Sequence, residues 1–333
     1  MVMKNKFRVA LIGCGAIAPN HLRAIIDCDQ ELCALCDINT DHAEALKKRF
    51  DLGDVPIYKS YVDMLETEKP DSVHICTPHY LHAEMVCETL SRNVHVLCEK
   101  PLCISYSELD KIEKAVAASN AVLGVCHQNR YEDNMLILHD LAKDGIIGGV
   151  GYMLWKRDAD YYASAEWRGT NDMEGGGVLI NQALHTLDLL TWVCGMPKYV
   201  TAHTTCDSLK DVIEVEDTAF MRFELPNGTP LNFFATNACG ADFNPRLEVK
   251  LADNRRVNAS NKIITVDNEV LNHKAKEIYS GKAVWGAGHT KLIADFYQKI
   301  GNGEKFELGF EEASKVIRLI LATYRSDGQK IEI

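Results

Sequence analysis

The sequence contains no apolar run long enough to cross a membrane, and its start lacks the cleavage site of a signal peptide. Basic residues are in deficit: 36 lysines and arginines stand against 47 aspartates and glutamates, so the formal net charge is −11. This balance argues against a general nucleic-acid binder, which needs a basic surface. We find no internal repeat, low-complexity tract or long linker. A length of 333 residues, 47% of them hydrophobic, is typical of a two-domain globular protein.

The pattern of a disulfide scaffold is also missing. Twelve cysteines are scattered through apolar segments, as Cys76, Cys98 and Cys126 illustrate. Free cysteine behaves as a small buried hydrophobe, so we expect a reducing, cytoplasmic compartment. Cys33 and Cys36 form a CxxC pair, but they fall in a predicted strand, where residues three apart point to opposite faces. We therefore predict no metal site there, and no other metal cluster is evident in the sequence.

The sequence pattern changes near residue 125, and the two parts together predict an α/β protein. Residues 1–125 alternate short apolar runs with helical patterns, which predicts an N-terminal doubly wound parallel sheet. Residues 126–333 hold longer strand-like runs, a predicted hairpin at Asn227-Gly228 and two closing helices near 290–300 and 310–324. This second part predicts an α+β domain on a large, mostly antiparallel, open-faced sheet.

A glycine-rich turn follows the first predicted strand and opens a helix. Gly13, Gly15, Ala16 and Ile17 belong to a G-x-G-x-x-A motif, the alanine variant of the dinucleotide fingerprint. Its glycines let the backbone approach a pyrophosphate, and the helix start offers N–H groups to it. Asp37 ends the second strand 24 residues after Gly13, where a carboxylate can bind the ribose hydroxyls and repel a 2′-phosphate. The motif predicts NAD rather than NADP, although Asp37 could also cap the next helix.

A polar stripe marks the mostly apolar segment GGGVLINQALHTLDLL. After the glycines at 175–177, Asn181, His185 and Asp188 are spaced i, i+4 and i+7, which places them on one helix face. Such a stripe needs internal partners or a ligand. His185 titrates near neutral pH and can move protons, but a satisfied core histidine would fit the spacing equally well.

Three motifs, two of them new and one the helix just described, identify a family. They are CTPHYLH from Cys76, HVLCEKP from His95, and the GGG…H…D helix. With the glycine motif they make the whole chain resemble the glucose-fructose oxidoreductase, inositol dehydrogenase and rhizopine catabolism family, Gfo/Idh/MocA. The resemblance implies a nicotinamide-dependent oxidoreductase with an N-terminal Rossmann domain and a C-terminal sheet domain. On the cofactor side it implies roles for Thr77, Pro78, His82, Glu99 and Lys100.

The resemblance also implies the catalytic residues. It places Lys100 beside the nicotinamide and the substrate hydroxyl, and it maps the histidine of the family's GGG…H…D helix onto His185. Either could be the base that takes the hydroxyl proton. Many relatives carry aspartate at the position of Asn181, so the resemblance implies that Asn181→Asp is tolerated. Asp188 matches another family position and could orient His185.

Weaker candidates surround this set. Trp167 and Arg168 resemble a family pair that reaches the cofactor from the second domain, but a core aromatic beside a surface arginine is as plausible. Arg157 and Tyr162 could line the substrate pocket, with Arg157 suited to a carboxylate or phosphate, or could lie on a strand surface. His289 begins the penultimate predicted helix and is a candidate cap.

Together these features predict an NAD-dependent dehydrogenase acting on a sugar, cyclitol, sugar acid or nucleotide sugar. Two alternatives stay open: a redox-neutral NAD-dependent glycosidase or epimerase-type enzyme, and a non-catalytic dinucleotide or sugar sensor. The resemblance further implies a homodimer or homotetramer that packs through the open face of the C-terminal sheet. No nucleic acid or membrane partner is expected.

Overall fold

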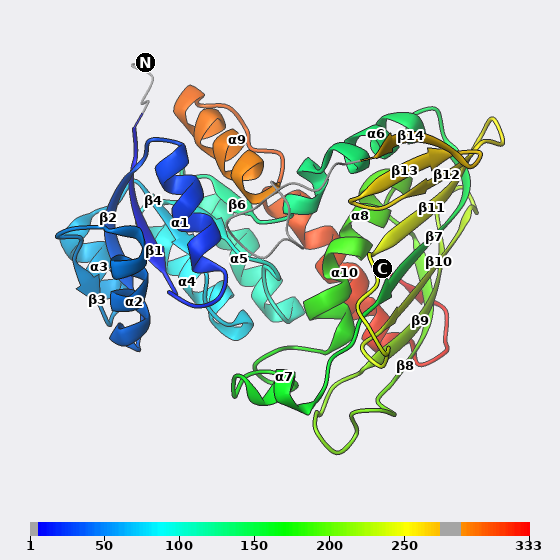
Figure 1. Ribbon diagram of the computed structural model, residues 1–333, viewed down its shortest axis with the longest axis horizontal. Helices are drawn as coiled ribbons and strands as arrows, with labels where there is room; N and C mark the ends of the chain where they lie inside the picture. The colour runs from blue at the N-terminus through cyan, green and yellow to red at the C-terminus, as the bar shows by residue number, and fades with distance from the viewer. Residues whose placement is uncertain (1–5, 274–287) are drawn as a thin grey trace. The chain divides into compact units, whose positions relative to one another are not determined.

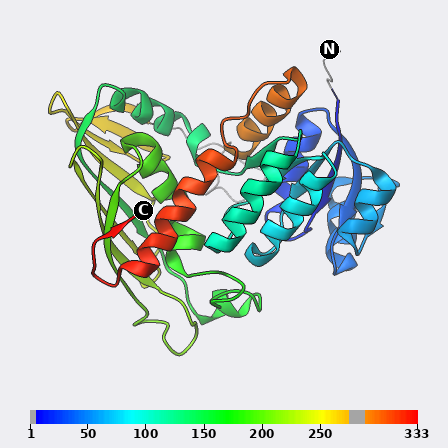
Figure 2. The same ribbon diagram turned by 180° about the vertical axis from the view of Figure 1, so that it is seen from behind.

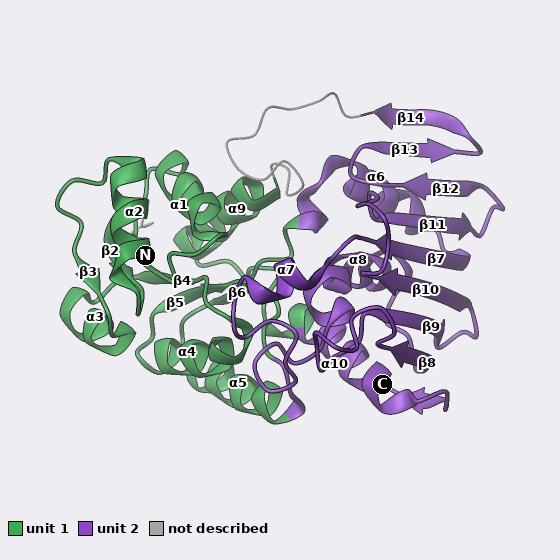
Figure 3. Ribbon diagram, turned by 60° about the horizontal axis from the view of Figure 1, so that its bottom comes forward, with its two compact units in different colours: residues 1–103, 107–128, 279–313 green, residues 104–106, 129–278, 314–333 purple. Residues whose placement is uncertain are grey.

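The computed structural model describes residues 6–273 and 288–333, and the chain divides into two compact units (Figure 3). Unit 1 comprises residues 1–103, 107–128 and 279–313, and unit 2 comprises residues 104–106, 129–278 and 314–333. The sequence predicted a division into 1–125 and 126–333; in the structure residues 288–313 belong to the first compact unit. The reason is that helix α9 (Gly288–Asn302) packs against helix α1 (Ala18–Asp27).

Unit 1 is built on a six-stranded parallel sheet with the order β3-β2-β1-β4-β5-β6. Figure 3 shows α1, α2 and α9 on one side of this sheet and α3, α4 and α5 on the other. The predicted doubly wound sheet is confirmed. The remaining bounds are β1 Arg8–Ile12, β2 Glu31–Cys36, α2 Thr40–Phe50, β3 Ile57–Tyr58, α3 Tyr61–Glu68, β4 Ser72–Ile75, α4 His79–Ser91, β5 His95–Cys98, α5 Tyr106–Ala118 and β6 Leu123–Val125.

The register of the central strands brings three loops to one edge of this sheet. Ile12 at the end of β1 pairs with Ile75 at the end of β4, and Ile75 pairs with Cys98 at the end of β5. The glycine turn, the loop at Thr77 and the EKP segment therefore start side by side. In open parallel sheets this carboxyl edge is where ligands bind.

Unit 2 is built on a nine-stranded sheet with the order β14-β13-β12-β11-β7-β10-β9-β8-β15. Only the β7–β10 pair is parallel among its described strands, and β9 and β10 form the predicted hairpin at Asn227-Gly228. The mostly antiparallel sheet is thus confirmed. Its strands are β7 Ile146–Leu154, β8 Tyr199–Thr205, β9 Thr218–Glu224, β10 Pro230–Thr236, β11 Arg246–Leu251, β12 Arg256–Ala259, β13 Ile263–Val266, β14 Glu269–His273 and β15 Ile331–Glu332.

Helices cover one face of this second sheet (Figures 1 and 2). Helix α8 (Leu184–Cys194) packs on β7 and β11, and α6 (Asp133–Ala142) packs on α8 and β12. Helix α10 (Phe310–Ser326) lies on the same face in both views, and the short helix α7 spans Ala159–Ala163. Helices α6 and α7 were not predicted from the sequence. Within the described ranges, no helix is both long enough and apolar enough to span a bilayer.

Candidate active site

The glycine turn of unit 1 brings the backbone of three strands close together. Gly13 has a φ of +87°, and a Cβ there would lie 2.6 Å from the carbonyl oxygen of Cys76. The N–H of Gly13 donates to the Cys36 carbonyl at 2.8 Å. Asp37 then accepts from the backbone N–H of Cys14 at 2.8 Å. Any side chain at position 13 would push this turn off the β4 loop.

The space beside this turn fits a dinucleotide. Gly15 and Ala16 are exposed, and a Cβ on Gly15 would meet nothing within 4 Å. Helix α1 starts after Ile17 with no side-chain cap; Pro19 has no N–H and the N–H of Asn20 donates to the Ile17 carbonyl, so the backbone before Pro19 is the part of this turn suited to receive phosphate oxygens. Next to Asp37, the side chain of Ile38 is 88% exposed, which suits a flat apolar ligand face. Sequence reasoning missed Ile38, because an exposed apolar residue has no periodic signal.

The loops after β4 and β5 are joined by a histidine. His82 is fully buried, and its ring nitrogens lie 2.8 Å from the carbonyl oxygen of Thr77 and 2.6 Å from that of Pro101. The Lys100–Pro101 peptide is cis, and Lys100 is half-buried at the sheet edge. These contacts make His82 a brace between the loops that carry Thr77-Pro78 and Lys100.

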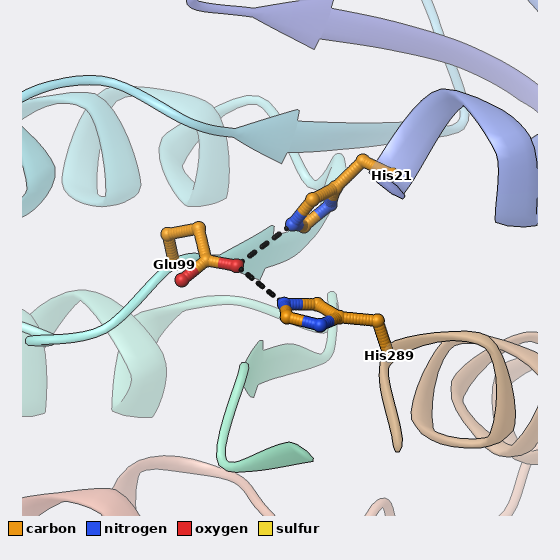
Figure 4. Close-up of side chains that lie close together, drawn as sticks. All are labelled: His21, Glu99 and His289. Carbon is orange, nitrogen blue, oxygen red and sulfur yellow. Dashed lines mark hydrogen bonds and ion pairs between the residues drawn. The ribbon is translucent and has the colours of Figure 1, made fainter. Parts of the chain in front are cut away.

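Glu99 lies at the centre of a buried cluster in unit 1 (Figure 4). Its Oε1 lies 2.9 Å from Nε2 of His21 and 3.0 Å from Nε2 of His289, while its Oε2 accepts from the backbone N–H of Lys100 at 3.2 Å. His289, a candidate helix cap from sequence, is instead a partner of this carboxylate. The contacts of Glu99 hold the backbone nitrogen of Lys100 in place.

One arrangement of protons satisfies the whole chain of contacts. An ionised Glu99 accepts from both Nε2–H groups, so Nδ1 of a neutral His21 must accept from Nδ1–H of His74, 2.8 Å away. Nε2 of His74 then accepts from the Tyr297 hydroxyl at 2.7 Å. Burial alone would raise the pKa of Glu99, but the two histidine donors hold it well below its usual value. Burial lowers the pKa of His21 and lowers that of His74 further, in keeping with neutral rings.

The same three side chains, His21, Glu99 and His289, could reach a single metal ion. A metal would need both imidazole Nε2 atoms as lone-pair donors. In the arrangement above those atoms carry the protons that satisfy Glu99, and the rings are held by partners in turn. We therefore interpret the cluster as a hydrogen-bonded support for the EKP segment.

In unit 2, three glycines let a helix start among packed segments. A Cβ added at Gly175, Gly176 or Gly177 would collide with Ile104, Tyr324 or Glu216 respectively. The segment continues as one π-helical turn, Leu179–Ala183, and then as α8. The glycine triplet is thus required by close packing.

Glu216 anchors the start of this helix. Its carboxylate accepts from the backbone N–H of Gly177 at 2.8 Å and of Leu179 at 2.9 Å, and from the Tyr324 hydroxyl at 3.0 Å. Burial raises the pKa of Glu216, although these donors oppose the shift. Sequence reasoning gave Glu216 no role, because its partners lie far away in the chain.

The helical segment at 176–191 exposes side chains along one strip only, made of Asn181 and His185, which we call the accessible line. From Gly176 to Thr191 every residue is buried except Asn181 and His185, which are half-buried. An otherwise buried helix that exposes only an amide and an imidazole is suited to meet a polar ligand.

Asp188 has a different environment. It is buried, and Nε and NH2 of Arg130 contact its two oxygens at 2.8 and 2.6 Å. Arg130 also lies over the ring of Trp192, 5.5 Å from its centroid. This bidentate pair ties the segment before α6 to α8. The sequence offered no signal for Arg130.

Tyr161 joins the accessible line to the loop before it. Its hydroxyl oxygen accepts hydrogen bonds from the side-chain amides of Asn181 at 3.3 Å and Gln182 at 3.0 Å. The same oxygen contacts the guanidinium of Arg168. Its neighbour Tyr162, the predicted pocket residue, is only 3% exposed and bonds Asn237 at 2.9 Å. The tyrosine beside Asn181 is therefore Tyr161, which sequence reasoning passed over.

Two arginines stack on aromatic rings around Tyr161. Arg168 lies 4.5 Å from the centroid of Tyr161 and 4.7 Å from that of Trp167. Arg157 lies 5.0 Å from the centroid of Tyr161, and its NH1 contacts Asp242 at 3.1 Å. The predicted residues Arg157, Trp167 and Arg168 thus gather around one tyrosine of unit 2.

Family models match both units. An "oxidoreductase family, NAD-binding Rossmann fold" model matches residues 7–127, and a "GFO/IDH/MocA C-terminal domain" model matches residues 135–253. The chain belongs to the Gfo/Idh/MocA oxidoreductase family. The predicted family, its NAD cofactor and its enzymatic class are thereby confirmed.

Relatives within the Gfo/Idh/MocA family extend over the whole chain. D-glucoside 3-dehydrogenase of Escherichia coli is 26% identical over 90% of this chain and 97% of its own. A WlbA dehydrogenase from Chromobacterium violaceum, solved with NADH and UDP-GlcNAcA, is 27% identical, covers 100% of this chain and 97% of its own, and has a TM-score of 0.85. The WlbA dehydrogenase from Bordetella pertussis, with the same ligands, is 25% identical over 98% of this chain and 99% of its own, with a TM-score of 0.84.

Proposed function

We propose that this Gfo/Idh/MocA enzyme oxidises a secondary alcohol of a sugar, cyclitol, sugar acid or nucleotide sugar with NAD. The observation that carries the proposal is the accessible pair Asn181 and His185 on an otherwise buried helix. An imidazole and an amide at such a position suit a hydroxylated substrate, and the other unit is the family's NAD-binding module.

Each residue has a defined task in this proposal. Bound NAD supplies the hydride acceptor. His185 takes the hydroxyl proton, and Lys100 as a cation stabilises the charge that develops on the alcohol oxygen. The reverse assignment, with Lys100 as the base, stays open, since a lysine at a sheet edge could also take the proton. The glycine turn and Asp37 bind the pyrophosphate and ribose, and Arg168 and Trp167 keep the role in cofactor binding that the family resemblance implies.

A substrate screen tests this function directly. The relatives named above support a panel of UDP-GlcNAcA and D-glucosides, to which the family's inositol dehydrogenases add myo-inositol, offered with NAD and followed by NADH absorbance. Net NADH formation with one class supports the dehydrogenase. Substrate conversion without net NADH supports a redox-neutral enzyme, whereas cofactor binding with no turnover on any member contradicts the proposal and leaves the sensor.

The open face of the unit 2 sheet supports the predicted self-association. Phe220 on β9 is 54% exposed, and its ring lies 4.7 Å from that of Phe234 on β10. We propose a homodimer or a dimer of dimers that covers these rings, in a cytoplasmic enzyme whose twelve cysteines are free thiols. Sedimentation at micromolar concentration is the measurement, and a monomer contradicts the association.

A further inference from the structure

A third buried carboxylate, after Glu216 and Asp188, lies directly behind the accessible line. Glu174, in the loop before the glycine triplet, is completely buried. One of its oxygens accepts from the backbone N–H of Gly169, and the other accepts from the side-chain amide of Asn181. A buried carboxylate that ends on a half-exposed amide couples the interior of unit 2 to the surface of the site.

The donors of Asn181 are thereby turned inward. A carboxylate only accepts, so the contact must use the Nδ2 side of the amide. Nδ2 also contacts the Tyr161 hydroxyl at 3.3 Å, on that same side. The two hydrogens of the amide therefore point at Glu174 and Tyr161, and Oδ1 points the other way. On the accessible line Asn181 thus offers an acceptor.

From these contacts we infer that Glu174 is a positioning residue for the substrate-binding group of the site. It fixes Asn181 as a hydrogen-bond acceptor, and Asn181 then selects substrates that present a hydroxyl donor beside His185. This inference rests on the proposed function, since it names the polarity that the substrate must have. It also concerns charge: in the Glu174–Asn181 pair, Glu174 supplies the carboxylate and position 181 supplies a neutral amide.

This arrangement reverses the expectation that Asn181→Asp is tolerated. In that variant a second carboxylate would stand at hydrogen-bond distance from the buried Glu174, and two such groups cannot both stay ionised without cost. Conversely, Glu174→Gln places an amide against an amide. The new glutamine must keep an acceptor for Gly169, so its donor faces Asn181 and forces that side chain to turn its own donors outward.

Exchanging the carboxylate of Glu174 and the amide of Asn181 tests the inference. In Glu174→Gln/Asn181→Asp, the new amide donates to the new carboxylate, and its oxygen still accepts from Gly169, so every contact is satisfied and an acceptor again faces outward. With NAD and the substrate found in the screen, we expect each single variant to lower kcat/KM by about tenfold or more and the double variant to recover to within about threefold of the parent. NAD affinity should stay unchanged in all four proteins.

Asp172→Asn is the matched control. It removes one carboxylate from the same loop, but Asp172 is exposed, so kcat/KM should not change. Near-parental activity of Asn181→Asp overturns the inference, and so does a double variant no better than its worse parent. If Glu174→Gln does not fold, Asn181→Asp and the double variant still decide between these outcomes.

A readout without substrate separates this inference from the proposed function. If the parent transfers no hydride to any member of the panel, the proposed function fails. The urea midpoints of the same four proteins at pH 7.5 then still test the contact. Both single variants should unfold at lower urea than the parent, and the double variant should regain most of the loss. A midpoint of Asn181→Asp equal to that of the parent contradicts the contact itself.

Discussion

Lowering the pH from 7.5 to 5.5 should destabilise unit 1 through its buried histidines. Burial lowers the pKa of His21 and His82, and lowers that of His74 well below its usual value of 6.5. As the pH falls below 6.5, the unfolded chain takes up protons at these sites more readily than the folded protein does. Stability is therefore complete above pH 6.5 and is lost toward the folded pKa. Glu99, whose pKa is lowered from 4.5, loses its contribution only below that pH and does not enter this window.

The size of the effect follows from the linkage relation. At pH 5.5 an unfolded histidine is one pH unit below its pKa, which favours unfolding by about 1.4 kcal/mol for each ring that stays neutral when folded. His74, with the largest shift, should supply nearly all of that amount. The three rings together set an upper limit of about 4 kcal/mol, a large share of the stability of a typical domain.

His74→Gln isolates this contribution. Glutamine can donate to His21 and accept from Tyr297, as His74 does, but it does not titrate. We expect urea denaturation followed by far-ultraviolet circular dichroism to show a loss between pH 7.5 and 5.5 that is smaller in His74→Gln by about 1.4 kcal/mol. His42→Gln is the matched control, because the side chain of His42 in unit 1 is 57% exposed. Equal pH dependence in the parent and in His74→Gln would refute the neutral buried ring.

Three further outcomes follow from the site. Lys100→Ala and His185→Ala should each lower turnover by about a hundredfold, the scale of a lost acid–base group, while NAD affinity measured by titration stays normal in His185→Ala; near-parental turnover of His185→Ala at all pH values would make that histidine structural. The parent should bind NAD more tightly than NADP, since Asp37 would meet the 2′-phosphate; equal binding in calorimetric titration would remove Asp37 from the ribose site. Arg130→Met should destabilise the protein by about 3–5 kcal/mol in urea, because Asp188 is then left buried without its cation; a loss below about 1 kcal/mol would mean that this pair contributes little.

The strand–helix alternation of the first 125 residues predicted unit 1 because each parallel strand is a continuous apolar run between helical patterns. It could not assign α9. Periodicity shows that a helix has an apolar face, and α9 buries Leu292, Ile293 and Phe296. It does not show which sheet covers that face, so a helix about 160 residues beyond β6 was placed with the second domain.

Local motifs predicted the residues whose tasks are local. Gly13 and Gly15 act through the turn that contains them, and their spacing is their signal. Tyr161 and Tyr162 show the limit of prediction from local motifs. Both lie on the short helix α7, and neighbouring helical residues point about 100° apart. One enters the core and the other meets Asn181, and only the packing of α7 decides which.

The predicted polar stripe of Asn181, His185 and Asp188 combines residues with two different roles in the structure: two are accessible and one is a buried structural group. One π turn at Leu179–Ala183 precedes α8, so the spacing of an ideal α-helix does not hold through the segment. Asn181 and His185 remain accessible, while Asp188 is buried against Arg130. Three buried carboxylates thus serve this helix in different ways: Glu216 anchors its start, Glu174 orients its amide and Asp188 ties it to a neighbouring segment. Because all three charges are engaged in holding the helix, His185 is the titratable side chain of residues 176–191 that stays accessible for the proton transfer proposed above.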